Sequence, residues 1–587
     1  MVKRKAQGIV VKRDPVAKAA AAAAPAPPPP PGAEAAEEEE EFEAQPAGQQ
    51  ARRRKKRRRP TAEAATPGAA AASSSSTPAI SSMPLPPAGT ASCASAAGSG
   101  TPAQSPLAPG NERLTPTEVL EWLLWPISPS TFFSEYWEKK PLHVRRGRPY
   151  HYGGLFAKAD LDRHLREEAA DFKYGERINL ARFDAEAGRK ISLNKGDRGA
   201  PVAASDVDAA WAEGASIQAM HPQQYHEPVW RLLTSLERAF AALFGANAYL
   251  TPAGRQGLAP HFDDVEVVML QLEGSKHWRL HAPPEDEEYP LPREYSRDFV
   301  PGELGELLLD CTLEPGDLLY LPRGTVHYGV TQGQGSKGAE GPGSFSHHLT
   351  VSTYQKTAWC DLLEKALLSA LGRAASESID FRAGLPVGFL GYMGSWHDCE
   401  AASSAEAADG RAAFQRRLKG LVGRLQDFID ADEVCDELGV DFMSQRLPPA
   451  RPSSSNSQGS GSVGGRAEKE NGAGTVALGD RVRWLDPSAV RAMISTDPDT
   501  SEATVMLFHS CANTRGQHMC KAVEAEEEVG CLRFEAATFL PAIHALYGAG
   551  NEFVRCSDLP LADEGDKAAL CENLLEAGLL ERAPPTG

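Results

Sequence analysis

The sequence predicts an α+β protein in which a β-barrel or double sheet is enclosed by helical segments. Apolar residues recur with the helical period of about 3.6 after residue 114 and again over 357–445. Between about 245 and 355 the period falls towards two, which is typical of strands. At 587 residues the chain exceeds the roughly 250–300 residues of a single core, so several domains are predicted.

Residues 1–112 are predicted to be a disordered tail, because Ala, Pro, Ser and Gly dominate and large apolar side chains are too few to offset the entropy of ordering. The tail contains an acidic run at 37–41 and eight consecutive cations at 52–59. Eight adjacent cations must be solvated or bound to an acidic partner. The run therefore indicates nuclear or nucleolar targeting with weak RNA contact, and an inert solvated tail is the alternative.

The rest of the chain is acidic. The net charge of −18 excludes a protein that coats nucleic acid by overall charge, and it suits basic partners such as ribosomal proteins or histone tails, or simply aids solubility. The ten cysteines form no C-x-x-C pair, so buried thiols in a reducing compartment are expected. No apolar run approaches the roughly 18 residues of a membrane helix, and the start lacks the apolar stretch of a secretory signal.

Order is predicted to begin near Leu114 with two helices. The segment 115–118, Thr-Pro-Thr-Glu, has the pattern of a capping box before an amphipathic helix. The aromatic-rich segment 132–142 is predicted to form a second helix that ends at Pro141. Core packing is the simplest role for its aromatic side chains.

Strands are predicted through the central stretch. Residues 265–272 alternate between two faces of one strand, and Gly274-Ser275 provides a turn into a second strand at 276–280. Further strands are predicted at 318–321 and 348–354.

The chain returns to a helical period after the central stretch. Amphipathic segments at 362–368 and 414–429 serve either as a dimer surface or as core packing within one chain. The Ser/Gly-rich stretch 449–475 is predicted to be a flexible linker. Residues 476–587 mix short strands with helices, and a final helix followed by Gly-Leu-Leu is similar to the approach to the wing of a winged-helix module.

One constellation of metal-ligand side chains stands out. His261 and Asp263 lie two residues apart, so on a strand they would project to the same face. The segment 314–327, E-P-G-D-L-L-Y-L-P-R-G-T-V-H, indicates a turn, an apolar strand, a second turn and then His327. Two histidines and one carboxylate form the facial triad that holds iron(II) in non-haem oxygenases, and they leave positions open for a keto acid and dioxygen. Taken singly, either histidine is as well explained as an ordinary polar residue in a turn.

The order H-x-D, then E-P-G-D-x-L-Y-x-P-x-G-x-x-H, with F-S-x-x-Y-W-x-K-K-P-L upstream, resembles the JmjC ribosomal oxygenases. The resemblance implies a double-stranded β-helix catalytic domain with a helical lead-in over 113–355, a helical dimerisation region over 356–448 and a winged-helix domain over 476–587. It also implies an iron(II)- and 2-oxoglutarate-dependent enzyme that forms a homodimer and hydroxylates a histidine of a large-subunit ribosomal protein. Demethylation of methyl-lysine on histone H3 is attributed to the family too.

The resemblance further implies contacts for the co-substrate 2-oxoglutarate. Lys276 follows the turn at 274–275 and offers a cation to the distal carboxylate of 2-oxoglutarate, although a surface lysine is the alternative. Asn247 matches the position of a polar co-substrate contact. Tyr249 and Ser352 are candidates for lining the substrate cleft, and a structural role explains either of them as well.

Two other functional classes stay open. A cupin-type metal enzyme that does not use 2-oxoglutarate would keep the triad but have no use for Lys276. A non-catalytic chromatin or ribosome-assembly scaffold would be favoured if a triad residue were absent, and none is. The triad is the same for hydroxylation and for demethylation, so it does not choose between them.

Overall fold

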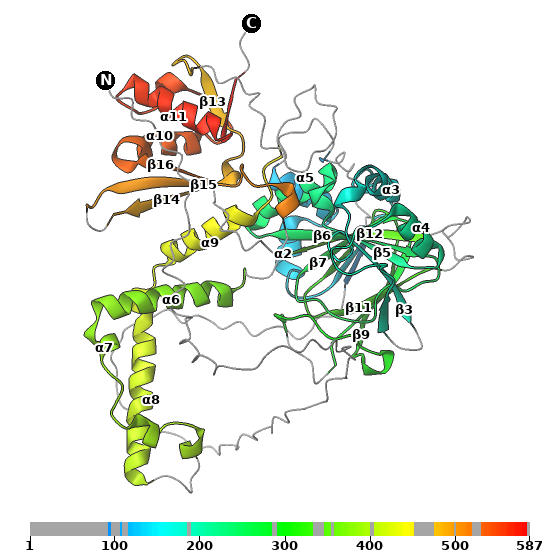
Figure 1. The fold of residues 1–587 in the computed structure, drawn as a ribbon, viewed down its shortest axis with the longest axis horizontal. Helices are drawn as coiled ribbons and strands as arrows, with labels where there is room; N and C mark the ends of the chain where they lie inside the picture. Colours follow the sequence, from blue (N-terminus) through cyan, green and yellow to red (C-terminus); the bar gives the residue numbers. More distant parts are fainter. Residues whose placement is uncertain are drawn as a thin grey trace, which may run out of the picture. The chain divides into compact units, whose positions relative to one another are not determined.

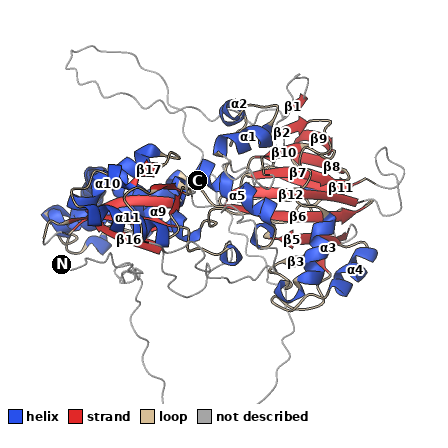
Figure 2. Cartoon of the chain, turned by 90° about the horizontal axis from the view of Figure 1, so that it is seen from above, coloured by secondary structure: helices blue, strands red, loops and turns tan. Residues whose placement is uncertain are grey.

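The computed structural model of the chain describes residues 92–95, 106–107, 115–184, 189–284, 290–332, 345–353, 357–398, 404–450, 475–497, 500–518 and 530–583. Its centre is a β-barrel made of two sheets (Figure 1). The larger sheet has the strand order β1-β2-β10-β7-β12-β6-β5-β3-β4, and most of these strands are seen side by side in Figure 2. The smaller sheet has the order β11-β8-β9. The double-sheet expectation is therefore confirmed.

The strands of the larger sheet come from distant parts of the sequence. They are β1 (Ser92–Ser95), β2 (Leu142–Arg145), β3 (Ile178–Asp184), β4 (Arg189–Ser192), β5 (Ser216–Met220), β6 (Phe244–Pro252), β7 (Val267–Glu273), β10 (Leu318–Leu321) and β12 (Phe345–Thr353). The smaller sheet contains β8 (Lys276–His281), β9 (Leu307–Leu313) and β11 (Val326–Thr331).

Strand β7 shows how the two-residue period builds both sides of the core. Val267 and Met269 pack between the two sheets with Trp278 of β8, whereas Val268 and Leu270 face the helices on the outer side of the larger sheet. The turn at Gly274 then carries the chain from one sheet to the other. Gly274 has φ +59, and a Cβ there would lie 1.7 Å from the carbonyl oxygen of Phe345, so only glycine fits this crossing.

Helices cover the outer face of the larger sheet. The capping box predicted at Thr115 is present, with Thr115 and Glu118 bonded reciprocally at the start of the first helix. The helices on this part of the chain are α1 (Pro116–Leu124), α2 (Pro129–Glu135), α3 (Lys158–Glu167), α4 (Ala204–Ala212) and α5 (Glu227–Phe240).

The predicted helix over 132–142 is wrong in its extent. Helix α2 ends at Glu135, a series of turns follows, and Leu142 already belongs to β2. The reason is a long-range contact, because Glu138 takes a left-handed conformation (φ 56) that lets its backbone N–H donate to the hydroxyl of Tyr320. The aromatic side chains are nevertheless packed as expected, with Phe132 buried.

Two short pieces of the predicted disordered tail 1–112 are ordered in the structure. Strand β1 pairs in parallel with β2, and Leu107 is buried in the main core. Backbone pairing at a sheet edge needs no apolar pattern, so composition did not reveal it. The cationic run 52–59 and most of the linker 449–475 lie outside the described residues.

After the barrel the chain forms a helical region and then a small α+β module with its own core. The helical region holds α6 (Trp359–Glu377), α7 (Ile379–Arg382), α8 (Ala405–Leu425) and α9 (Ala431–Gln445). The C-terminal module holds β13 (Arg481–Trp484), β14 (Val490–Thr496), β15 (Ala503–His509), β16 (Gly530–Glu535), α10 (Ala536–Ala549), β17 (Val554–Arg555), α11 (Glu564–Glu576) and β18 (Leu580–Arg582). No helix within the described ranges combines the length and apolar character needed to cross a membrane.

Candidate metal centre

Three side chains that could hold a metal ion meet at one point of the barrel. His261 and His327 are joined by a pair of backbone hydrogen bonds, from His261 N to His327 O at 3.3 Å and from His327 N to His261 O at 2.8 Å. Asp263 is held beside them, since its carbonyl oxygen accepts from the backbone N–H of Gly324 at 2.9 Å. His261 and Asp263 were expected on a continuous strand, but this segment forms only the single bridge to His327 before β7 begins.

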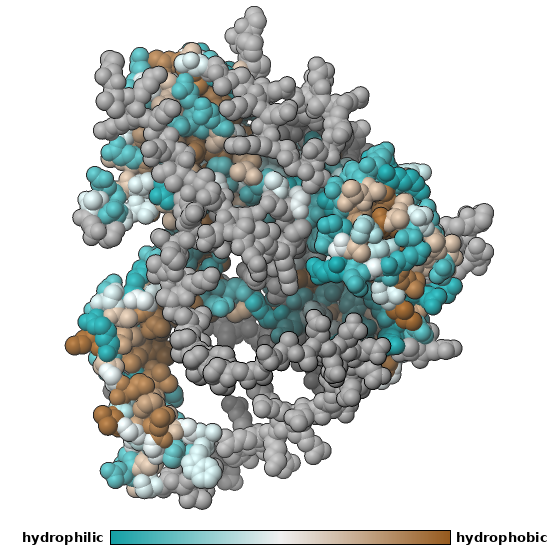
Figure 3. All heavy atoms as spheres, in the orientation of Figure 1, coloured by the Kyte–Doolittle hydropathy of each residue, from teal (hydrophilic) through white to brown (hydrophobic). Residues whose placement is uncertain are grey.

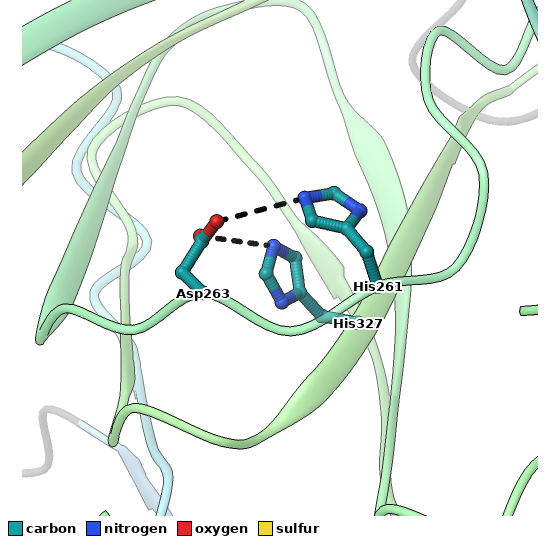
Figure 4. Close-up of side chains that lie close together, drawn as sticks. All are labelled: His261, Asp263 and His327. Atoms are coloured by element: carbon teal, nitrogen blue, oxygen red, sulfur yellow. Dashed lines mark ion pairs between the residues drawn. The ribbon is translucent and has the colours of Figure 1, made fainter. Parts of the chain in front are cut away.

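The ligand atoms of the three residues converge as Figure 4 shows. Nε2 of His261 lies 3.8 Å from Oδ1 of Asp263, and Nε2 of His327 lies 3.7 Å from Oδ2 of the same carboxylate. Ligand atoms that each bind one ion at roughly 2.0–2.2 Å lie at most roughly 4.4 Å apart. Both carboxylate distances are within that limit, so the residues fit a shared metal ion.

Backbone carbonyls orient both imidazole rings. Nδ1 of His261 is 2.8 Å from the carbonyl oxygen of Ala259, and Nδ1 of His327 is 3.0 Å from that of Thr325. A carbonyl only accepts, so each Nδ1 carries the hydrogen and each Nε2 keeps its lone pair for a metal. Burial also lowers the pKa of His327 to about 4, which keeps its ring in the neutral form that binds metal.

A cavity opens beside the three ligands, and Lys276 lies at its wall. The ammonium group is buried, lies 3.5 Å from the hydroxyl of Thr251 and sits 4.8 Å from the centre of the Trp278 ring. Burial lowers the pKa of Lys276 to about 7. Lys276 is therefore a buried cation rather than the surface lysine that was the alternative.

The other three candidate residues lie on the strands that form the cavity. Tyr249 lines it, and its ring stacks on His348 with the centroids 5.2 Å apart. Asn247 is on the same face of β6 as Tyr249, and its buried Oδ1 lacks a hydrogen-bond partner. Ser352 lies on the face of β12 that carries His348 but is not among the residues that line the cavity.

The sequence reasoning missed several polar residues of this cavity. Thr251 follows Tyr249 at the two-residue spacing of a strand, so the alternation could have found it. Gln218, which donates to the hydroxyl of Tyr249 at 3.0 Å, comes from β5 and carries no motif of its own. The further lining residues are Ala181, Lys190, Ser216, Gly257, Leu258, Met269, Trp278, Tyr328, Gly329, His348 and Thr350.

Two imidazoles and one carboxylate on a two-sheet barrel are typical of metal-binding cupin-like proteins, and the JmjC domain family, which is one class of these, matches residues 218–355. Ribosomal oxygenase 1 of zebrafish is 34% identical over 479 residues, which cover 81% of each chain. A lancelet (Branchiostoma floridae) protein, the bifunctional lysine-specific demethylase and histidyl-hydroxylase NO66, is 34% identical over 80% of this chain and 68% of its own. The chain therefore belongs to the ribosomal oxygenases, and the expected JmjC oxygenase is confirmed.

Among solved structures, that of the Escherichia coli ribosomal oxygenase YcfD in complex with cobalt and 2-oxoglutarate covers 78% of this chain and 99% of its own. It is 13% identical, with a TM-score of 0.36.

Proposed function

We propose that this chain is an iron(II)- and 2-oxoglutarate-dependent protein hydroxylase whose metal ligands are His261, Asp263 and His327. The observation that carries the proposal is the combination of two imidazoles with their Nε2 lone pairs directed towards one carboxylate and a buried cation in the same cavity. When bound, iron(II) with 2-oxoglutarate and dioxygen supplies the oxidising chemistry for an unactivated C–H bond.

Lys276 supports a keto-acid co-substrate rather than a cupin enzyme without one. A buried ammonium is costly unless an anion meets it, and the cost here is visible in its lowered pKa. A distal carboxylate would supply a charge-assisted hydrogen bond, with Thr251 beside it as a second donor. We assign Asn247 to the polar end of the same co-substrate site, because it lies on the face of β6 that carries Tyr249 and its side-chain amide N–H group can donate a hydrogen bond to an oxygen of the keto acid.

The target favoured by the cavity is a neutral side chain. Among the described residues that line it, Asp263 supplies the sole carboxylate, while Lys276 and Lys190 supply cations. Because the charge of Lys276 is assigned to the co-substrate, Lys190 is the lining cation that would face the target, and it disfavours the cationic methyl-lysine of histone H3 relative to a histidine of a large-subunit ribosomal protein. Tyr249, with Gln218 bonded to its hydroxyl, and Ser352 on β12 are the proposed contacts to the target.

The decisive experiment compares both target classes in one assay. Ribosomal proteins and methylated histone H3 peptides would be incubated with the enzyme, iron(II) and 2-oxoglutarate and then analysed by mass spectrometry. We expect a gain of one oxygen on a histidine, and none with Asp263→Ala. Loss of methyl groups without histidine hydroxylation would replace the ribosomal target with the histone target, and no change in either class would reject the proposal.

We also propose that the chain is a homodimer formed through the helical region 356–448. Apolar side chains gather on the surface of this region (Figure 3). Trp359 is 80% exposed, Leu368 68% and Trp396 77%, and leaving such side chains in water is unfavourable. A second copy of the chain would cover them.

Further proposals concern the C-terminal module, the cationic run in the N-terminal tail and the linker. The C-terminal module over 476–587 has helices α10 and α11 beside the small sheet β17-β13-β18, an arrangement that supports a winged-helix domain. The cationic run 52–59 supports placement in the nucleus, within the nucleolus, where ribosomal proteins are assembled and where the run would make weak RNA contacts. The Ser/Gly-rich stretch 449–475 is the proposed flexible linker between the helical region and the C-terminal module.

A further inference from the structure

One buried acid near the metal ligands has no part in the site described so far. Glu266 is 2% exposed and ends the loop that begins at His261. Its Oε1 accepts from the guanidinium of Arg323 at 3.0 Å, and its Oε2 accepts from the hydroxyl of Tyr320. A buried carboxylate without such partners would be strongly unfavourable.

The pair of Glu266 with Arg323 lies between two segments that we call the ligand loops, namely 261–266, which holds His261 and Asp263, and 322–325, which leads into β11 and His327. Glu266 is three residues after Asp263, and Arg323 is four residues before His327. The ion pair of Glu266 with Arg323 therefore links the two loops on one side, and the backbone bond from Gly324 to Asp263 links them again nearby. Neither Glu266 nor Arg323 is among the residues that line the cavity.

The aromatic-rich segment 132–142 also contacts the partners of Glu266. Glu138 donates its backbone N–H to the hydroxyl of Tyr320 at 2.8 Å, and its carboxylate lies 2.8 Å from the guanidinium of Arg323. The Tyr320 ring packs against Phe132 and Trp137, at centroid distances of 4.9 and 5.9 Å. The unusual left-handed Glu138 thus connects the aromatic segment to both ligand loops.

We propose that Glu266, Arg323, Tyr320 and Glu138 form a clasp that fixes the spacing of the two ligand loops, so that metal affinity depends on residues that do not touch the metal. The proposal rests on the proposed metal site. Glu266 acts as a positioning residue, since its contacts reach Asp263 and His327 only through the backbone of their loops. Loss of a supporting partner at metal sites typically weakens binding by about ten- to a hundredfold.

The test uses Glu266→Gln in the full chain. Burial already raises the pKa of Glu266 to about 7, so the fold accommodates a neutral form of this side chain, and glutamine is its nearest isostere. Glu273→Gln is the matched control, because Glu273 lies at the other end of β7 and bonds to His347 and to the backbone of Lys158, away from the ligand loops. Cobalt(II) is the probe, since its visible absorption reports both its affinity and its coordination geometry.

We expect Glu266→Gln to raise the Kd for cobalt(II) by about tenfold and to alter the absorption band, while Glu273→Gln leaves both unchanged at a similar melting temperature. If Glu266→Gln lowers the melting temperature but binds cobalt(II) as the wild type does, the acid is only structural and the clasp is rejected. Should Glu266→Gln fail to fold, Tyr320→Phe, which removes one hydroxyl from the clasp, must show the same weakened binding. Failure of the wild type itself to bind cobalt(II) would instead reject the proposed metal site.

Discussion

Replacing Lys276 by methionine should weaken the binding of 2-oxoglutarate and raise the stability of the protein without co-substrate. Methionine keeps an unbranched stem of similar length and removes the charge. A charge-assisted hydrogen bond contributes roughly 1.5–3 kcal/mol, so Lys276→Met should weaken 2-oxoglutarate by roughly ten- to a hundredfold. Lys276→Ala should weaken 2-oxoglutarate binding to a similar extent. Lys276→Arg keeps the charge but should not restore the full wild-type affinity, because a planar guanidinium is larger than the ammonium it replaces beside Trp278 and Gly329.

The same substitution should stabilise the protein without co-substrate. A pKa of about 7 in place of 10.5 means that the unfolded chain binds this proton more tightly than the folded chain does. The shift corresponds to a penalty on the order of 4 kcal/mol at neutral pH and below, and the penalty disappears as pH rises from about 7 to 10.5. Lys276→Met should therefore raise the melting temperature at pH 7, with little difference from the wild type near pH 10.5.

The assay is titration of 2-oxoglutarate against succinate formation, with melting curves on the same samples. Lys190→Met is the matched control, since this exposed lysine also lines the cavity and should leave the co-substrate requirement unchanged. For the wild type, affinity for 2-oxoglutarate should fall as pH rises above about 7, because the free ammonium loses its proton, and Lys276→Met should abolish that dependence. An unchanged co-substrate requirement in Lys276→Met would refute the assignment and favour an enzyme that does not use a 2-oxo diacid.

Three further outcomes are expected. His261→Ala should abolish activity and metal binding while leaving the melting temperature of the metal-free protein close to that of the wild type, as calorimetry can show. Light scattering at micromolar concentration should give twice the 62.9 kDa of one chain, and Leu368→Glu, which places a charge on the exposed face of α6, should return the mass of a single chain. Deleting 52–59 should disperse the protein into the cytoplasm, seen by fluorescence microscopy, without changing turnover of a peptide, and unchanged localisation would reject the targeting role.

Local patterns predicted the parts of this protein that are encoded locally. The capping box at Thr115 and the alternation along β7 need only neighbouring residues, and both are present. The H-x-D spacing and the turn before His327 led to three side chains that the structure brings together, although His261 and Asp263 were expected on a regular strand and their segment forms only a single bridge.

The structural features that the sequence did not predict depend on contacts between residues that are far apart in the chain. Helix α2 ends at Glu135 because the hydroxyl of Tyr320, far along the chain, accepts a hydrogen bond from the backbone N–H of Glu138. The turn at Gly274 is visible in the sequence, but the change of sheet at this turn is set by the approach of Phe345. Glu266 had no motif that separated it from a surface acid, since only the fold shows that Arg323 meets it.

The backbone pair between His261 and His327 has a consequence for how the chain folds. Each ring is oriented by a carbonyl two residues before it, so each half of the site is encoded by its own short segment. The halves nevertheless meet only after a loop of more than sixty residues has closed, which is an entropic cost that local structure does not offset. An ion bound to both halves acts as a reversible cross-link across that loop. It binds the folded state alone, and so should raise stability in proportion to the logarithm of its concentration and slow unfolding of the barrel.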